Sequence, residues 1–457
     1  MKKLKISENQ NLNKKSIKKK TRSWNAGLFT SLVTILVIFF TVYQGEIKAE
    51  TGAKIKVVNG KPELFIDGVK TYIKGVGGTN KIDLAAQNGA NAFRTWSGNA
   101  GSIKRNIELA AANNMFIMQG IWLSKDRKSY LSDEYKNKMR TEIRLLAETY
   151  KDDKNLLIWG LGNEIDHEEQ ANTAAAWKFV DELAGIIKSV DNRHLVATVI
   201  THNPRALDSI ATYTKNLDLI GINSYGAIGN LEEVVNKSKY EGAYMVTEWG
   251  PTGWWENGKT SWKAPIEQTS EEKRKVYEDR YNKYILGSER CLGSFVFLWG
   301  QKEERTPTWF SMFVESNIEG LPLKGEKTPM VEAMERVWKG IELKQTAPVV
   351  EKMTINGKTA IESVTIKAGQ PFEGNISIKD KEGDKLTYHW EILKEATVLG
   401  SGGSHEPRPE RVGTVTTTEV NTVKTSLSEP GNYRLFVYVL DNTGFVSTAN
   451  VPFQIIP

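Results

Sequence analysis

Two glutamates stand at the ends of short apolar segments, and their placement predicts paired carboxylate chemistry. Glu164 follows the run LLIWGLGN that starts at Leu156, and Glu248 ends the run AYMVTE that starts at Ala243. Glutamate is seldom buried without a partner or a task. Two carboxyl groups in one cleft can protonate a leaving oxygen and act on the opposite face of a sugar, which is what cleavage of a glycosidic bond requires.

The elements that must position these glutamates alternate between strands and helices. Amphipathic helical patterns separate the apolar runs, and a last helix over Pro329–Leu343 would close the structure. Eight such units in about 270 residues predict a (β/α)8 TIM barrel of the α/β class, with a doubly wound open sheet as the alternative. The expected strands are Thr71–Val76, Ala90–Trp96, Met115–Trp122, Leu156–Leu161, Leu195–Ile200, Leu217–Ile222, Ala243–Thr247 and Gly293–Leu298, and the clearest helices are Ile103–Ala112, Glu134–Tyr150, Ala171–Val190 and Glu271–Leu286.

In this barrel Glu164 ends the fourth strand and Glu248 the seventh. Active sites of the fold lie at the carboxyl ends of the strands. Strands four and seven face each other across the mouth, so we expect carboxyl groups about 5 Å apart, the separation typical of hydrolysis with retained configuration. The structural alternatives are a helix-start role for Glu164 and an ion pair between Glu248 and Arg94.

Residues 55–340 resemble the retaining (β/α)8 glycoside hydrolases of clan A, and in particular the catalytic barrel of glycoside hydrolase family 2. The likeness rests on Asn163-Glu164 after a buried strand, on Glu248 before Trp-Gly, and on the segments KGVGG, GANAFRTW and MFIMQGIWL. It implies that Glu164 is the acid/base and Glu248 the nucleophile. The family's Arg-His pair is replaced by Gly77-Gly78, and its N-terminal sugar-binding sandwich is missing, which counts against a galactosidase or glucuronidase specificity.

The same resemblance implies roles for four more residues. Asn163 would bind the 2-hydroxyl of the sugar, and Arg94 would orient the nucleophile. Tyr225 matches the position that contacts the nucleophile, and Trp299 would form the floor beneath the bound sugar.

Tryptophans after the strand ends independently predict a sugar-binding cleft, because aromatic faces stack on the C–H face of pyranose rings. We expect Trp96, Trp249 and Trp299 to line the cleft. Trp254 and Trp255 lie in the loop PTGWWENG and are expected to form a further substrate subsite.

The composition shifts at Gln345–Val350, a predicted linker, and residues 345–457 show the period-2 pattern of a small all-β sandwich. LTYHW and GNYRLFVYVLDNTG resemble immunoglobulin-like domains of the polycystic-kidney-disease type, with Trp390 in the core and Tyr433 at a corner. Residues 400–409 are predicted to be a mobile loop. We expect this domain to be a spacer, with glycan binding or packing on the barrel as alternatives.

The N-terminal 50 residues predict export. Residues 1–26 hold nine Lys/Arg and one Glu, and the uncharged apolar stretch Gly27–Tyr43 follows. This is the pattern of a cleaved signal or of an uncleaved membrane anchor, and it places the remainder outside the cytoplasm. The expected division is therefore 1–50 as signal or anchor, 53–344 as the barrel and 345–457 as the sandwich.

The remaining composition excludes several classes of function. The net charge of +6 comes from the basic N-terminus, since the rest of the chain has 52 Lys/Arg against 54 Asp/Glu, and no nucleic-acid partner is expected. Cys291 is the single cysteine, so no internal disulfide can form. The five histidines lack zinc-type spacing, and no phosphate or dinucleotide motif is present, so neither metal nor cofactor is expected.

These observations predict a retaining β-glycosidase that acts on an extracytoplasmic poly- or oligosaccharide. A transglycosylase that remodels β-glucan shares the same covalent intermediate, and a non-catalytic glycan-binding surface protein on a degenerate barrel is the alternative from another class. β-Glucan, β-mannan and β-galactan all remain open as substrates, with endo-acting glucanase-like or mannanase-like action favoured by the aromatic residues.

Overall fold

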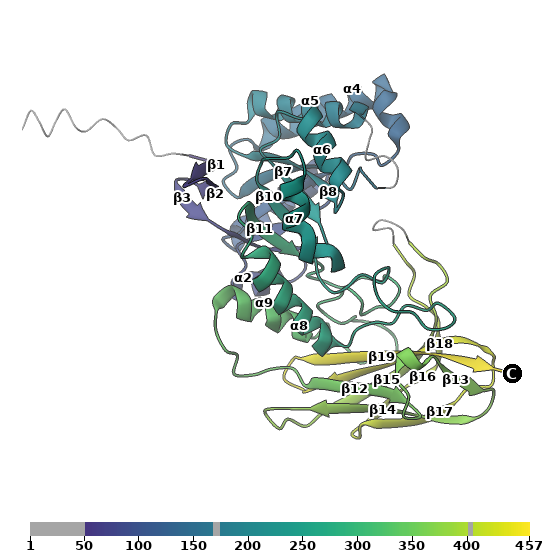
Figure 1. The fold of residues 1–457 in the computed structure, drawn as a ribbon. Helices are drawn as coiled ribbons and strands as arrows, with labels where there is room; N and C mark the ends of the chain where they lie inside the picture. Colours follow the sequence, from purple (N-terminus) through teal and green to yellow (C-terminus); the bar gives the residue numbers. More distant parts are fainter. Residues whose placement is uncertain (1–50, 168–173, 401–404) are drawn as a thin grey trace, which may run out of the picture. The chain divides into compact units, whose positions relative to one another are not determined.

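A computed structural model describes residues 51–167, 174–400 and 405–457 (Figure 1). Residues 51–457 form one compact unit, to which the following description applies. The predicted signal or anchor, including Gly27–Tyr43, lies outside the described residues. Within the three described ranges, no helix has the length and apolar character needed to cross a membrane.

Eight parallel strands close into a barrel in the order β10-β11-β4-β5-β6-β7-β8-β9. Each overlaps one of the eight predicted strands, so the barrel is confirmed and the open sheet is wrong. The strands are β4 (Ile73–Gly77), β5 (Ala92–Arg94), β6 (Phe116–Ile121), β7 (Leu156–Asn163), β8 (Leu195–Thr201), β9 (Leu219–Asn223), β10 (Tyr244–Trp249) and β11 (Cys291–Val296).

Helices cover the outer face of the barrel, so each strand is buried on both sides. Hydrogen-bonding side chains start several of these helices: Asn99 and Ser102 form a capping box at α3, and Thr269 forms one with Glu272 at α8. Gly340 adopts a left-handed conformation and ends the last helix. The helices are α2 (Ile82–Gln87), α3 (Ala100–Ala112), α4 (Asp133–Tyr150), α5 (Ala174–Val190), α6 (Pro204–Tyr213), α7 (Leu231–Lys237), α8 (Ser270–Arg280) and α9 (Pro329–Lys339).

A small antiparallel sheet precedes the barrel and packs against its amino-terminal end. It consists of β1 (Ala53–Val58), β2 (Lys61–Ile66) and β3 (Val69–Thr71). Leu64 and Ile66 join the same buried cluster as residues inside the barrel, including Ile73 and Met118. The sheet therefore closes the end of the barrel opposite to the carboxyl ends of the strands.

The C-terminal part of the chain is a β-sandwich-like region, hereafter the sandwich. One sheet has the order β12-β14-β17 and the other β13-β19-β18-β15-β16, and Trp390 lies in the core between them. The Tyr433 hydroxyl donates to the Glu429 carbonyl at 2.9 Å. The strands are β12 (Val349–Ile355), β13 (Val364–Lys367), β14 (Pro371–Lys379), β15 (Thr387–Lys394), β16 (Arg411–Thr418), β17 (Thr422–Ser426), β18 (Gly431–Leu440) and β19 (Val446–Ile456).

The sandwich packs on the barrel through buried polar contacts. Arg434 donates to the Pro265 carbonyl at 2.9 Å, and Asn450 donates to Glu267 at 2.7 Å. β12 starts at Val349, inside the segment that was predicted to be a linker. The sequence pattern therefore did not reveal how closely the two parts are joined.

A buried glutamate with a raised pKa, Glu303, lies in this interface. Glu303 is hydrogen bonded to Glu315, and Arg408 Nε lies 3.9 Å from Glu303 Oε1. Burial, together with the charge of Glu315, raises the pKa of Glu303 to about 9. An unfolded chain releases this proton near the ordinary glutamate pKa of about 4.3. The folded protein therefore loses stability as the pH rises from that value towards 9.

Glu303→Gln is expected to stabilise the protein at neutral and alkaline pH and to have little effect near pH 4. Glutamine keeps a neutral hydrogen-bonding side chain without the need to hold a proton. At pH 7 the gain in the free energy of unfolding is on the order of 4 kcal/mol. Thermal unfolding as a function of pH measures it, with the exposed Glu342→Gln as the control for the charge change. The same pH dependence in both variants would contradict the protonated state of Glu303.

Candidate active site

The two glutamates come from strands β7 and β10, which are the fourth and seventh strands of the barrel. Glu248 lies within β10 and points inward, and it is 7% exposed. Glu164 directly follows β7 and has a φ of 53°, a left-handed conformation that is uncommon for a residue other than glycine. Its amide donates to the Val199 carbonyl of β8 at 2.9 Å, which fixes this turn of the chain. Both carboxyl groups thus lie at the carboxyl ends of the strands, where the sequence predicted them.

Arg94 connects the residues around Glu248. Its guanidinium is 1% exposed and donates to Glu248 Oε1 at 3.2 Å and to the Thr247 carbonyl at 2.8 Å. The other terminal nitrogen donates to Asn163 Oδ1 at 2.5 Å. Charge-assisted hydrogen bonds of this kind fix both orientation and register. Arg94 therefore holds Glu248 and Asn163 in one arrangement.

Glu248 accepts hydrogen bonds from three different side chains. Besides Arg94, Trp96 Nε1 donates to Oε1 at 2.6 Å and the Tyr225 hydroxyl donates to Oε2 at 3.1 Å. The pKa of Glu248 is raised above its usual value, chiefly by burial; the charge of Arg94 opposes this rise and the charge of Glu164 adds to it. Burial also raises the pKa of Tyr225 well above its usual value, so this phenol stays protonated and remains a donor. The three donors all favour the ionised form of Glu248.

Glu164 has a different environment. Asn223 Nδ2 donates to its Oε1 at 2.8 Å, and Lys125 Nζ lies 3.6 Å from its Oε2. The Asn223 side-chain oxygen accepts from Thr247 Oγ1 at 2.8 Å, so the orientation of this amide is fixed. The negative charge of Glu164 raises the pKa of Glu248, so the two carboxyl groups interact electrostatically.

Aromatic side chains form one side of the site. We call Trp96, Tyr225, Trp254, Trp255, Phe297 and Phe310 the aromatic wall. The Phe297 ring packs edge-on against Trp96 at 5.7 Å, and Tyr225 packs against Trp255 and Phe310, both at 5.5 Å. Trp255 remains 47% exposed, so its face is open to a ligand. The wall brings together the predicted residues Trp96, Tyr225, Trp254 and Trp255.

Two predicted cleft residues are wrong. Trp249 follows Glu248 in a part of β10 whose pairing with β9 and β11 is irregular, so the regular alternation that starts from the inward Met245 is broken before residue 249. Its indole is therefore on the outside of the barrel, fully buried against Tyr277 and Tyr281.

Trp299 is also fully buried away from the wall. It packs on Phe313 and on Trp338 of α9, and its Nε1 donates to the Lys81 carbonyl. Strand β11 ends at Val296, so the side-chain alternation of the strand does not extend to residue 299. Phe297, rather than Trp299, packs against Trp96 and Tyr225 in the wall.

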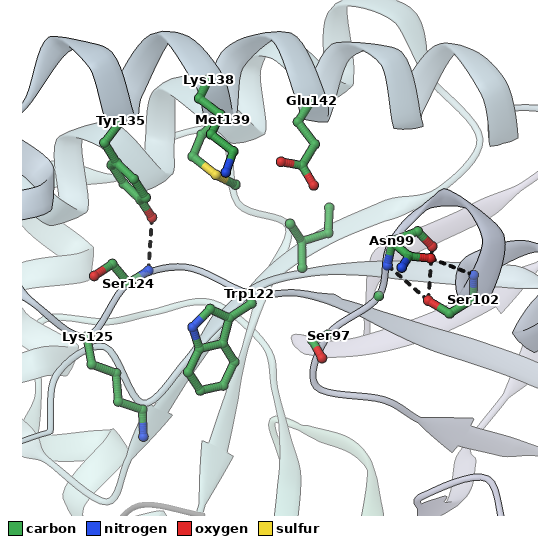
Figure 2. Close-up of a pocket in the computed structure, with 12 residues that line it drawn as sticks. Ser97, Asn99, Ser102, Trp122, Ser124, Lys125, Tyr135, Lys138, Met139 and Glu142 are labelled. Atoms are coloured by element: carbon green, nitrogen blue, oxygen red, sulfur yellow. Dashed lines mark hydrogen bonds between the residues drawn. The ribbon is translucent and has the colours of Figure 1, made fainter. Parts of the chain in front are cut away.

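A cavity of about 660 Å³ lies between α3, α4 and the loop after β6. Figure 2 shows Trp122 and Lys125 on one side of it and Tyr135 and Glu142 of α4 on the other. Neither Glu164 nor Glu248 lines the cavity, but Lys125 lines it and also pairs with Glu164. Trp122 is 48% exposed here. The lining of the cavity is thus polar and aromatic, and Lys125 connects it with Glu164.

Sequence reasoning missed four residues of the site. Asn223 ends strand β9 and could have been found by the rule that selected the glutamates, because it is a polar residue at the end of a buried strand. Lys125, Phe297 and Phe310 carry no comparable signal, since loop geometry determines their positions. Among the described residues, no group of three or more His, Cys, Asp or Glu side chains is arranged to hold a metal ion.

Comparison with known proteins gives partial matches to glycoside hydrolases. The chain is 30% identical over 118 residues to mannan endo-1,4-beta-mannosidase 4 of Oryza sativa subsp. japonica, which is 26% of this chain and 23% of that protein. It is 35% identical over 71 residues to mannan endo-1,4-beta-mannosidase 5 of Solanum lycopersicum, 15% of this chain and 17% of that protein. The chain thus spans about a fifth of the length of these curated relatives. No protein-family model matches it.

Solved structures with a similar fold include a β-glucuronidase of Bacteroides uniformis, with a TM-score of 0.45 and 12% identity over 89% of this chain and 48% of that one. The endo-β-1,4-mannanase of Thermotoga petrophila has a TM-score of 0.41 and 13% identity, over 84% of this chain and 98% of that one. The closed barrel of eight parallel strands is a TIM barrel, and over 26% of its length the chain is similar in sequence to a glycoside hydrolase.

Proposed function

We propose that this protein is a retaining glycosidase that hydrolyses β-glycosidic bonds in a poly- or oligosaccharide by double displacement. The observation that carries the proposal is the different environment of the two carboxyl groups at the ends of β7 and β10. Glu248 is held by three donors, among them the buried Arg94, as suits a fixed anion. Glu164 has other partners: it accepts a hydrogen bond from Asn223 and lies near the Lys125 ammonium group.

In the first step, Glu248 attacks the anomeric carbon while Glu164 donates its proton to the leaving oxygen. The C–O bond to the leaving sugar breaks, and an ester between Glu248 and the glycosyl group forms. Lys125 stabilises the Glu164 carboxylate that results. In the second step, Glu164 takes a proton from water, the water oxygen attacks the anomeric carbon, and the Glu248 carboxylate is released.

Asn163 suits a substrate-binding role. Arg94 occupies its side-chain oxygen, and within the described part of the chain its amide nitrogen makes no hydrogen bond, so this group can donate to a sugar hydroxyl. The partial matches to mannan endo-1,4-beta-mannosidases support a β-mannan substrate and endo action. The exposed Trp122 and Trp255 support an extended glycan rather than a single sugar unit.

The sequence supports the proposed cellular location, and the structure of the sandwich supports its proposed domain class. The basic segment 1–26 followed by Gly27–Tyr43 supports an extracytoplasmic location, with membrane attachment if this segment is retained. The buried Trp390 and the hydrogen bond from Tyr433 to the Glu429 carbonyl support an immunoglobulin-like assignment for the sandwich.

A glycan panel with product analysis by proton NMR tests this function. Incubation with β-mannan, β-glucan and β-galactan is expected to release oligosaccharides from one of them, first as the β-anomer, with mutarotation later. Glu248→Gln is the matched control and should release none. Initial formation of the α-anomer would contradict the retaining mechanism. Glycan binding without any turnover by the wild type would favour the non-catalytic alternative.

A further inference from the structure

One segment of the sandwich reaches the loop of the barrel that supports the aromatic wall. We call residues 405–411, which precede and begin β16, the arm. Within it Glu406 is only 2% exposed, although this stretch was expected to be part of a mobile loop. Glu406 accepts hydrogen bonds from the Arg305 amide at 2.7 Å and from the Arg305 guanidinium at 3.2 Å. The arm thus binds the barrel loop that follows β11.

Arg305 continues this connection to the wall. Its guanidinium lies over the Trp254 ring, 3.8 Å from the centroid, and the adjacent Glu304 accepts a hydrogen bond from Trp254 Nε1 at 2.9 Å. Trp254 packs edge-on against Trp255 at 5.3 Å, and Trp255 contacts Tyr225. Because Tyr225 donates to Glu248, five consecutive contacts connect Glu406 of the arm with Glu248.

Buried ion pairs keep the arm itself in place. Arg408 donates to Glu315 of the barrel at 2.8 Å and to Glu391 of β15 at 2.6 Å. The Glu391 side chain is fully buried and also accepts from Arg411 and from the Tyr438 hydroxyl, both at 2.9 Å. Buried ion pairs therefore fix the arm to both the barrel and the sandwich. Removing one partner of such a pair would strongly lower the free energy of unfolding, because a buried charge would be left unpaired.

We propose that Glu406 of the sandwich is a positioning residue for sugar binding, which acts by holding Arg305 against Trp254 and so keeps the aromatic wall in its binding arrangement. The sandwich then has a role in substrate recognition beyond that of a spacer. This inference rests on the proposed glycosidase function, because the wall is taken to contact the sugar. A free Arg305 side chain would leave Trp254 without its stacking partner, and the loop carrying Glu304 would lose its bond to the arm.

Glu406→Gln tests the proposal, because it removes the charge and keeps the size of the side chain. The KM for the polysaccharide is expected to rise about tenfold, the loss corresponding to one charge-assisted hydrogen bond, while kcat stays within about twofold. The matched control is Glu395→Gln, which neutralises another partly buried glutamate of the sandwich. Glu395 pairs with Arg434, which also reaches the barrel at the Pro265 carbonyl.

A second measurement does not depend on activity. In protein labelled with 5-fluorotryptophan, Trp254→Phe assigns the fluorine resonance of Trp254. Glu406→Gln is expected to shift or broaden this resonance, and Glu395→Gln to leave it unchanged. If Glu406→Gln does not fold, Arg305→Lys replaces it, since lysine keeps the charge but lacks the planar group that stacks on Trp254.

The outcomes separate this inference from the proposed function. A raised KM together with a changed Trp254 resonance supports the positioning role. An unchanged resonance, or a changed resonance with an unchanged KM, overturns it. If the wild type hydrolyses no glycan, the proposed function fails. The same variants are then compared by glycan binding, and equal affinities of Glu406→Gln and Glu395→Gln overturn the positioning role.

Discussion

Glu248→Ala is expected to lower kcat on an aryl β-glycoside by roughly four to six orders of magnitude. The variant lacks the oxygen that forms the covalent bond, and Arg94, Trp96 and Tyr225 are left with no carboxylate to bind. Release of the aryl group, followed by absorbance under single-turnover and steady-state conditions, measures the loss. Glu241→Ala, an exposed glutamate before the same strand, serves as the control and should retain full activity.

Added azide distinguishes a missing nucleophile from a damaged fold. The space left by the Glu248 carboxylate admits a small anion, which attacks the anomeric carbon from the same face and gives an α-glycosyl azide. Recovery of turnover with this product assigns Glu248 as the nucleophile. A loss of less than tenfold in a correctly folded variant would overturn that assignment.

Glu164→Ala is expected to show an effect that depends on the leaving group. For a glycan or an alkyl β-glycoside, which need protonation of the leaving oxygen, kcat/KM should fall by about 10²–10⁴. For a dinitrophenyl β-glycoside, which needs no proton, the first step should be nearly unaffected. Single-turnover kinetics on the two substrates measure this difference, with the exposed Glu134→Ala as the control.

The second step gives an independent test of Glu164. Without a general base, the glycosyl–enzyme ester should accumulate with the dinitrophenyl substrate, and azide should release it as a β-glycosyl azide. The opposite anomer from that of the Glu248 variant identifies which carboxyl group has which role. Equal losses on both leaving groups would contradict the assignment of Glu164 as the acid/base.

The barrel and its two glutamates could be predicted because each strand is buried on both faces. Such strands read as continuous apolar runs, and a charged residue at the end of one is conspicuous. The order of eight runs then placed Glu164 and Glu248 at the fourth and seventh strands. The same rule, applied to Asn223 at the end of β9, would have found the amide that holds Glu164.

The errors have a common physical origin. Proximity to a strand end does not decide which face of the barrel a side chain takes. The irregular pairing of β10 between Val246 and Trp249 places Trp249 on the outside, against Tyr277. Trp299 lies beyond the end of β11, where the turn of the chain brings Phe297 to the wall instead. Contacts such as Arg305 with Glu406 join residues about a hundred positions apart, and no local pattern encodes them.

The small antiparallel sheet β1-β2-β3 covers the amino-terminal end of the barrel, so the barrel is open only at the carboxyl ends of its strands. Leu64 and Ile66 close the far end, and the interior between them and the glutamates is filled by side chains such as Met118 and Phe295. No ligand can thread through the barrel, so both fragments of a cleaved molecule must depart on the side where the intact molecule arrived. If the proposed double displacement operates, the fragment attached to Glu248 blocks binding of the next substrate molecule, and its slow departure would limit the turnover rate at high substrate concentration.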